Sequence, residues 1–170
     1  NISEIDLSGV PQLKQLSISN NYLSQINVEN LDNLIMLIIN NNYFTFETLP
    51  LHKPTYVRYY YHSQFPIEIT DEGGVVDLSS QCYVDGAATI YRWFVGLPTV
   101  DENGMFVGEE LVEGEDYIIE EGVTSFLSKF NDVMCVMVNE NLPDVIIYTY
   151  LINVTADVEE IAASDEVLVM

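Results

Sequence analysis

The side chains most able to do chemistry in this sequence are its carboxylates, which occur in adjacent pairs along the second part of the chain. Two carboxylates that flank one substrate can serve as the acid and base of a glycoside hydrolase. Neighbouring residues of a β-strand point to opposite faces, so an adjacent pair cannot flank one substrate. An acid-dependent hydrolase is therefore the least favoured function, and we predict that the chain is not an enzyme. The pairs are Glu109 and Glu110, Glu115 and Asp116, and Glu120 and Glu121.

The other reactive side chains lie outside recognised catalytic or metal-binding motifs. The two histidines belong to no nucleophile or metal signature. Cys82 and Cys135 form no CxxC motif and no cluster with histidine that could hold zinc. The sequence DENG at residues 101–104 lacks the ligand spacing of an EF-hand calcium loop. We therefore predict no metal and no cofactor.

The sequence is strongly acidic, with 27 Asp and Glu against five Lys and Arg and a net charge of −22 at pH 7. Nucleic acid backbones and anionic membrane surfaces repel such a chain, so we predict no nucleic acid partner. No apolar run approaches the roughly 18 to 20 residues of a membrane span, which predicts no membrane insertion in this segment. The chain begins at Asn1 without Met or a leader, as expected of a trimmed segment whose signal peptide and anchor lie outside it.

A repeat organises the first third of the chain. Two segments match the leucine-rich repeat pattern L-x-x-L-x-L-x-x-N-x-L. Its alternating apolar residues form a short strand that stacks on the next coil, and its Asn amide satisfies backbone groups at the corner. We therefore predict parallel coils in which Asn21 and Asn42 are buried, stacked and structural. The matching residues are Leu13, Leu16, Ile18, Asn21 and Leu23, and then Leu34, Leu37, Ile39, Asn42 and Phe44.

The strand positions that point away from such coils are free to vary, and solenoids bind ligands there. They are polar in the first coil, but in the second Met36 and Ile38 place two hydrophobic side chains at the surface. Two explanations stay open: these residues form a ligand patch, or the following domain covers them, which we favour. The candidate binding residues are Gln15, Ser17 and Ser19, then Met36, Ile38 and Asn40.

The periodicity ends after Phe46, and two prolines in residues 49–54 are expected to end the coils. The chain then alternates short apolar runs with turn dipeptides, which predicts about eight strands in an antiparallel sandwich. The expected turns are Gly73-Gly74, Asp85-Gly86, Asn103-Gly104 and Glu121-Gly122. The expected strands lie near residues 56–61, 67–69, 75–80, 90–95, 117–120, 123–127, 133–139 and 146–154.

A run of three tyrosines, residues 59–61, invites comparison with a sugar-stacking platform. Alternation along a strand places Tyr60 on the opposite face from its two neighbours. Packing in the core and between domains is therefore favoured over sugar binding.

The sequence resembles bacterial surface proteins of the internalin type and their relatives in gut Bacteroidetes, in which an immunoglobulin-like domain follows leucine-rich repeats. The repeats carry this resemblance, together with VVDLSS, TIYRWF, GEDY, VMCVMVN and NLPDVIIYT. It spans residues 5–155 and implies export and a role in recognition or adhesion. It also implies that Trp93 is the buried tryptophan of the sandwich core. The ligand of each member depends on its own outward residues, so no binding residue is carried over.

The resemblance leaves the state of the two cysteines open. Cys135 lies in a penultimate strand, where immunoglobulin-like domains carry the second cysteine of their disulfide. Ser80 occupies the place of the first cysteine, and Cys82 comes one inward step later. Two separate thiols are favoured over a bridge.

We accordingly predict a mostly β protein in three segments. Residues 1–50 form the C-terminal part of a leucine-rich repeat solenoid, residues 51–155 form an antiparallel immunoglobulin-like β-sandwich, and residues 156–170 form an acidic tail or the start of a further element. Because the last coil must be covered, we expect the sandwich to cap it through an apolar interface that includes Phe44, Phe46 and Leu49.

The predicted function is that of an exported recognition or adhesion module at the bacterial cell surface. An unknown protein or glycan would bind the outward face of the repeats, and the chain itself is expected to be a monomer. The alternative is a passive spacer or cap that presents another module.

Overall fold

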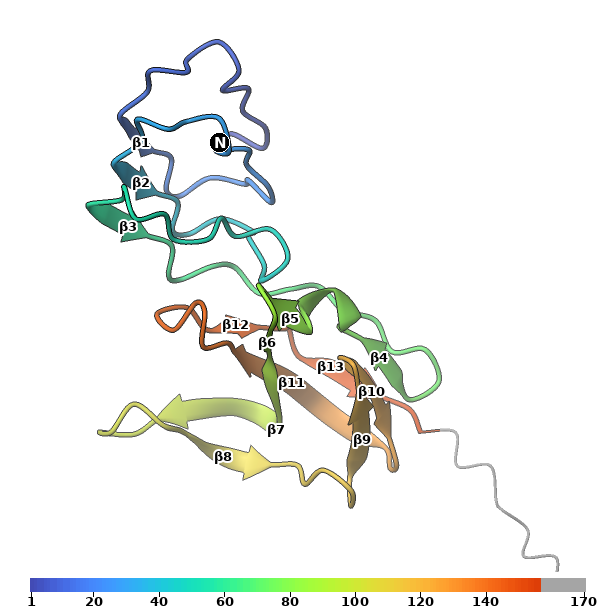
Figure 1. Ribbon diagram of the computed structural model, residues 1–170. Coiled ribbons are helices and arrows are strands. Elements are labelled where there is room, and N and C mark those ends of the chain that lie inside the picture. The colour runs from blue at the N-terminus through green and yellow to red at the C-terminus, as the bar shows by residue number, and fades with distance from the viewer. Residues whose placement is uncertain (157–170) are drawn as a thin grey trace, which may run out of the picture.

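Short parallel strands from successive coils form one end of the molecule, and antiparallel sheets form the other (Figure 1). The computed structural model describes residues 1–156. Within them the chain is mostly β, as predicted, with one short 3-10 helix, η1 (Ser79–Gln81). The strands are β1 (Gln15–Ser17), β2 (Met36–Ile38), β3 (Arg58–Tyr60), β4 (Val75–Asp77), β5 (Tyr83–Val84), β6 (Ala87–Ala88), β7 (Ile90–Val100), β8 (Phe106–Glu110), β9 (Tyr117–Glu120), β10 (Val123–Phe126), β11 (Phe130–Val138), β12 (Ile147–Tyr148) and β13 (Ile152–Val154).

Strands β1, β2 and β3 form a parallel sheet to which each successive coil contributes one strand. Leu16 pairs with Leu37, and Leu37 pairs with Tyr59. The inward side chains of the coils pack on one another, and Leu23, Leu34 and Leu37 are fully buried. We call residues 1–65 the coil part and residues 66–156 the antiparallel part.

The third coil corrects two predictions. We expected the periodicity to end after Phe46 and assigned the strand near residues 56–61 to the sandwich, but β3 extends the parallel sheet. Two changes concealed this coil: the step from Leu37 to Tyr59 is one residue longer than the step from Leu16 to Leu37, and tyrosines replace the leucines. Tyr60 is exposed and Tyr61 is buried, so the predicted alternation of the tyrosine run is confirmed.

The antiparallel part contains two larger sheets and one small hairpin. Their orders are β4-β10-β9 and β12-β11-β7-β8, with β13 also pairing with β11, while β5 pairs only with β6. Trp93 on β7 is fully buried, as predicted. Its indole N–H donates to Thr124 Oγ1 on β10 at 3.1 Å, and its ring meets the Phe126 ring edge-on at 4.9 Å between centroids. These contacts join the two sheets.

Several predicted strands are found with different bounds. The segment near residues 67–69 makes only one bridge, between Ile67 and Thr149. The strand expected near residues 75–80 ends at Asp77, and η1 begins two residues later. Strand β8 was not predicted, because its sequence FVGEE has only two apolar residues and a central glycine. The predicted turns Asp85-Gly86, Asn103-Gly104 and Glu121-Gly122 each connect two antiparallel strands.

One cluster of buried hydrophobic side chains runs through both parts and includes Phe44, Phe46 and Leu49, which were expected to line the shared interface. Hydrogen bonds cross the junction as well. Phe46 N–H donates to Gln81 Oε1 of η1 at 2.9 Å, and Asp144 N–H donates to Tyr61 Oη at 3.4 Å. The antiparallel part therefore covers the last coil.

In residues 1–156 no helix is long and apolar enough to cross a membrane. The prediction for the acidic tail falls on residues 157–170, outside the described part, apart from Ala156. The boundary at residue 50 concerns folding units and stays a prediction.

Candidate ligand-binding surface

Buried amide side chains hold the backbone of the coils in place. Asn42 is fully buried, and its Nδ2 donates to the carbonyls of Ile18, Ile39 and Asn40 at 3.0, 3.0 and 3.3 Å. Its Oδ1 accepts from Leu23 N–H at 3.0 Å. One side chain thus satisfies four backbone groups at the corner, which are costly to bury without partners. The predicted structural role of Asn42 is confirmed.

Asn21 makes the equivalent contacts in the first coil but is only half-buried. Its Nδ2 donates to the carbonyls of Ile18 and Ser19, and its Oδ1 accepts from Ile2 N–H. The prediction that Asn21 is buried is therefore wrong: it is half-buried, next to the exposed residues at the start of the chain.

Gln64 occupies the asparagine position of the third coil. Its Nε2 donates to the carbonyls of Tyr61 and Ile39, and its Oε1 accepts from Asn42 N–H and Phe44 N–H. Sequence reasoning missed this residue because it searched for Asn at a fixed step. Gln81, in the antiparallel part, plays a similar role, because its Oε1 accepts a hydrogen bond from Phe46 N–H. We call Asn21, Asn42, Gln64 and Gln81 the amide ladder.

The ladder fixes an outward face on the parallel sheet. We define the outward face as the first and last residue of each strand and the residue two positions after it, together with the exposed residue that directly precedes the strand. From the first coil these are Lys14, Gln15, Ser17 and Ser19; from the second, Ile35, Met36, Ile38 and Asn40; and from the third, Val57, Arg58, Tyr60 and His62.

All six predicted binding residues lie on the outward face. Gln15 and Ser17 are exposed, while Ser19, Met36, Ile38 and Asn40 are half-buried. Met36 pairs with Gln15 and Arg58, and Ile38 pairs with Ser17 and Tyr60, so both occupy the middle of the sheet. Neither belongs to the core cluster. Both are half-buried, with β3 beside them in the sheet. The expectation that the following domain covers them stays a prediction. Their role in binding stays a prediction.

The third coil adds residues that sequence reasoning missed. Val57 is 78% exposed and Tyr60 is 46% exposed, which is high for large hydrophobic side chains. Ile35 is also exposed. Met36 and Ile38 lie beside Arg58 and Tyr60 on this face. We call the apolar residues Ile35, Met36, Ile38, Val57 and Tyr60 the apolar patch, because exposed apolar side chains that gather on a surface mark interaction sites on soluble proteins. The signal that could have found Val57 and Tyr60 is the spacing of the tyrosines around them.

A groove of about 430 Å³ continues from the end of this face. His62 and Ser63 of the coil part form one end of it, and apolar residues of the antiparallel part form most of the rest. On the antiparallel sheet that contains β7 and β11, Phe94, Met134 and Val136 form a second hydrophobic cluster, separate from the main core. The residues that line the groove are His62, Ser63, Leu97, Pro98, Phe106, Met134, Val136, Asp144, Ile146 and Tyr148.

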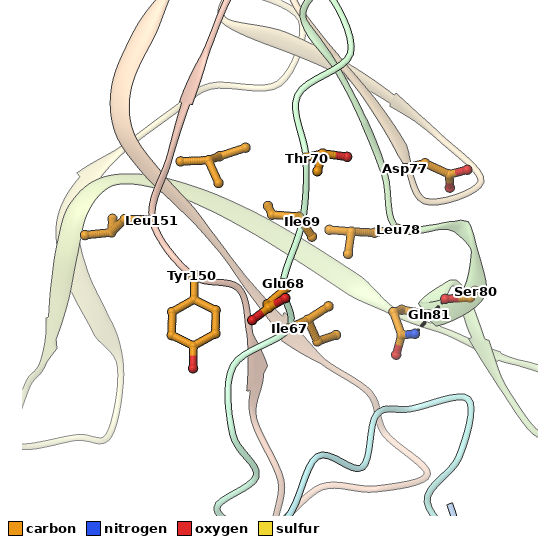
Figure 2. Close-up of a pocket in the computed structure, with 11 residues that line it drawn as sticks. Ile67, Glu68, Ile69, Thr70, Asp77, Leu78, Ser80, Gln81, Tyr150 and Leu151 are labelled. Carbon is orange, nitrogen blue, oxygen red and sulfur yellow. Dashed lines mark hydrogen bonds between the residues drawn. The ribbon is translucent and has the colours of Figure 1, made fainter. Parts of the chain in front are cut away.

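A second hollow, of about 780 Å³, is lined by residues from segments 67–70, 77–81 and 150–152 (Figure 2). Its two carboxylates, Glu68 and Asp77, are well separated from each other in Figure 2. Hydrogen bonds from Ser79 lower the pKa of Asp77, which keeps this carboxylate ionised. The hollow lacks the convergent groups expected of a catalytic site.

The acidic pairs weighed for catalysis are not brought together on one substrate face. Glu110 binds Arg92 through both oxygens, at 2.7 Å from Nε and 2.6 Å from Nη2. Hydrogen bonds from Arg92 lower the pKa of Glu110 and so oppose a role as general acid. Glu109 pairs with Val95 and Glu110 with Phe94, neighbours that face opposite sides of the sheet.

The cysteines and the acidic turn at residues 101–104 were the other candidate sites. Cys82 and Cys135 are separate thiols, and burial raises the pKa of Cys135. Within residues 1–156 no group of three or more His, Cys, Asp or Glu is placed to hold a metal ion. Asp101, weighed for calcium, instead accepts hydrogen bonds from Asn103 N–H and Met105 N–H in the turn between β7 and β8.

Comparison with protein-family models and with curated proteins finds no match for the chain. In residues 1–156, exposed or accessible apolar side chains gather on the outward face and along the adjoining groove, among other places.

Proposed function

We propose that the chain is a recognition module whose ligand binds the outward face of the parallel sheet. The observation that carries this proposal is the apolar patch: Met36, Ile38 and the exposed Tyr60 lie on β2 and β3, and the exposed Ile35 and Val57 directly precede these strands. A protein that leaves such side chains in water without a partner risks association, so their exposure favours a binding role.

The finer identity of the fold belongs to the same proposal. In it, the coils are the end of a leucine-rich repeat solenoid, and the antiparallel part is an immunoglobulin-like sandwich. The amide ladder and the steps of 21 and 22 residues support the first assignment. The buried Trp93 between two antiparallel sheets supports the second. The resemblance to internalin-type surface proteins supports export and adhesion.

The test uses matched pairs of substitutions. The first variant carries Val57→Glu and Tyr60→Ser on the outward face. The control carries Val107→Glu and Tyr83→Ser in the antiparallel part, where both side chains are similarly exposed. Wild type and both variants are screened against a panel of purified extracellular proteins and a glycan array.

The proposal expects at least one binder that the face variant loses by about tenfold or more and the control variant retains, since interface hot spots commonly exceed 1.4 kcal/mol. Circular dichroism should show that both variants stay folded. Binding that is equally retained by the face variant contradicts the proposal. A complete lack of binders also contradicts it and favours the passive spacer.

A further inference from the structure

The two parts of the molecule differ sharply in charge. Residues 1–65 contain five acidic and three basic residues, a net charge of −2, whereas residues 66–170 contain 22 acidic and two basic residues, a net charge of −20. Most of the acidity of the chain therefore lies away from the coils. A ligand that touches the coil part meets a surface quite unlike the average surface of the protein.

The outward face is the extreme case of this difference. Its twelve residues include no carboxylate, although the chain has 27. They include Lys14 and Arg58, two of the five basic residues of the chain. In the coil part all five acidic residues lie off this face, at positions 4, 6, 29, 32 and 47. The face thus combines apolar side chains at β2 and β3 with polar and basic ones around them, and it carries no negative charge.

The register places these two charges on opposite sides of the apolar patch. Arg58 is on β3 and Lys14 directly precedes β1, while Met36 and Ile38 lie on β2 between those strands. Neighbouring strands are about 4.8 Å apart, so the two backbones are separated by about 10 Å. Neither cation forms a salt bridge with a residue of the described part, and the Arg92–Glu110 pair is the one salt bridge found there.

Building on the proposed function, we infer that the ligand of the outward face is a protein segment that presents apolar side chains flanked by carboxylates. Carboxylates on the ligand would pair with Lys14 and Arg58 while its apolar side chains cover Met36, Ile38 and Tyr60. Cores of protein interfaces are depleted in charge and enriched in Tyr, Met and Arg, as this face is. A glycan would need many hydrogen-bond partners for its hydroxyls, and the middle of the face offers few.

The net charge of the whole chain predicts the opposite ligand. A charge of −22 attracts basic segments and repels acidic ones at long range. That repulsion is screened within about 8 Å at physiological ionic strength, so contacts on the face decide which ligand stays bound. Whether acidic or basic peptides bind therefore shows which of the two determines the ligand, the local surface or the net charge of the whole chain.

The experiment selects random 12-residue peptides displayed on phage against the immobilised chain. Parallel selections use the wild type, Arg58→Glu and Lys129→Glu. The two substitutions change the net charge equally, but Lys129 lies in the exposed turn between β10 and β11, outside the outward face. The enriched peptides are then synthesised and their affinities for all three proteins are measured.

We expect peptides enriched in Asp or Glu together with aromatic or aliphatic residues. They should bind Arg58→Glu about tenfold more weakly and bind Lys129→Glu as well as wild type. Peptides enriched in Lys and Arg would overturn the inference. The variant with Val57→Glu and Tyr60→Ser then distinguishes the two claims: basic peptides that it fails to bind leave the proposed function intact, and peptides that it still binds overturn that function too.

Discussion

The coil part and the antiparallel part stabilise their interiors by different means. Between the coils, the side chains of Asn42 and Gln64 are buried and satisfy backbone groups of adjoining coils. Between the antiparallel sheets, the corresponding role falls to large apolar side chains, with Trp93 at the centre and a single side-chain hydrogen bond to Thr124. Parallel coils have corners that leave backbone groups without ladder partners, whereas hairpins satisfy most of theirs in the sheet.

This difference explains where a binding surface can form. The amide ladder fixes the coils from inside, so the outward residues of β1, β2 and β3 need not contribute to packing. In the antiparallel part, the face opposite the main core is partly occupied by its own second cluster around Phe94. The coil part is therefore the better place for residues that bind a ligand.

The largest predicted effect tests whether the two parts fold as one unit. Phe46→Ser removes a buried ring from the cluster shared by both parts and should lower the free energy of unfolding by about 4 kcal/mol. Calorimetry should show one transition in the wild type and one in the variant. Phe65→Ser, at a partly exposed ring in the same region, is the control and should cost clearly less. Two independent transitions in the wild type would show that the parts are uncoupled.

The next effect compares two rungs of the amide ladder. Asn42→Ala leaves the buried Leu23 N–H without its partner and removes one donor from each of three carbonyls, so it should cost about 3 kcal/mol in denaturant unfolding. Asn21→Ala removes similar bonds where water can replace them, so it should cost about 1 kcal/mol or less. Equal costs at both positions would mean that burial does not decide the strength of the ladder.

Alkaline pH offers a smaller test, because both parts bury tyrosines. Burial, followed by nearby charges such as Glu113, raises the pKa of Tyr117 to about 12. A tyrosine in the unfolded chain ionises near pH 10, so the unfolded state loses its proton first and the free energy of unfolding should fall between pH 10 and 12. Tyr117→Phe should reduce that fall. Burial also raises the pKa of Tyr59 in the coil part, and Tyr59→Phe should act in the same direction.

The smallest effect is expected at the surface pair of Arg92 and Glu110. Both side chains are partly exposed, so Glu110→Gln should cost about 0.2 to 1 kcal/mol. The cost should shrink at high salt. A large cost that salt does not change would indicate that the pair supports the cluster around Phe94, over which Arg92 lies.

Particular residues show what the sequence could and could not predict. The first two coils and the burial of Trp93 followed from a fixed spacing and from a tryptophan within an apolar run. The third coil did not, because Tyr59 and Gln64 replace leucine and asparagine at a longer step. Six of the twelve residues of the outward face were consequently named from the sequence, and the other six, among them Arg58, Tyr60 and His62, were missed. The groove is lined by residues from distant segments, such as His62 and Tyr148, and spacing alone does not show that they come together.

The central claim is that the outward face of the parallel sheet binds the ligand, and amide hydrogen exchange tests it most directly. Exchange is measured for the wild type alone and with a saturating amount of the tightest selected peptide. The account predicts slower exchange in residues 35–40 and 57–62, with little change in residues 97–126. Protection confined to the antiparallel part, with no change in β2 or β3, would contradict it.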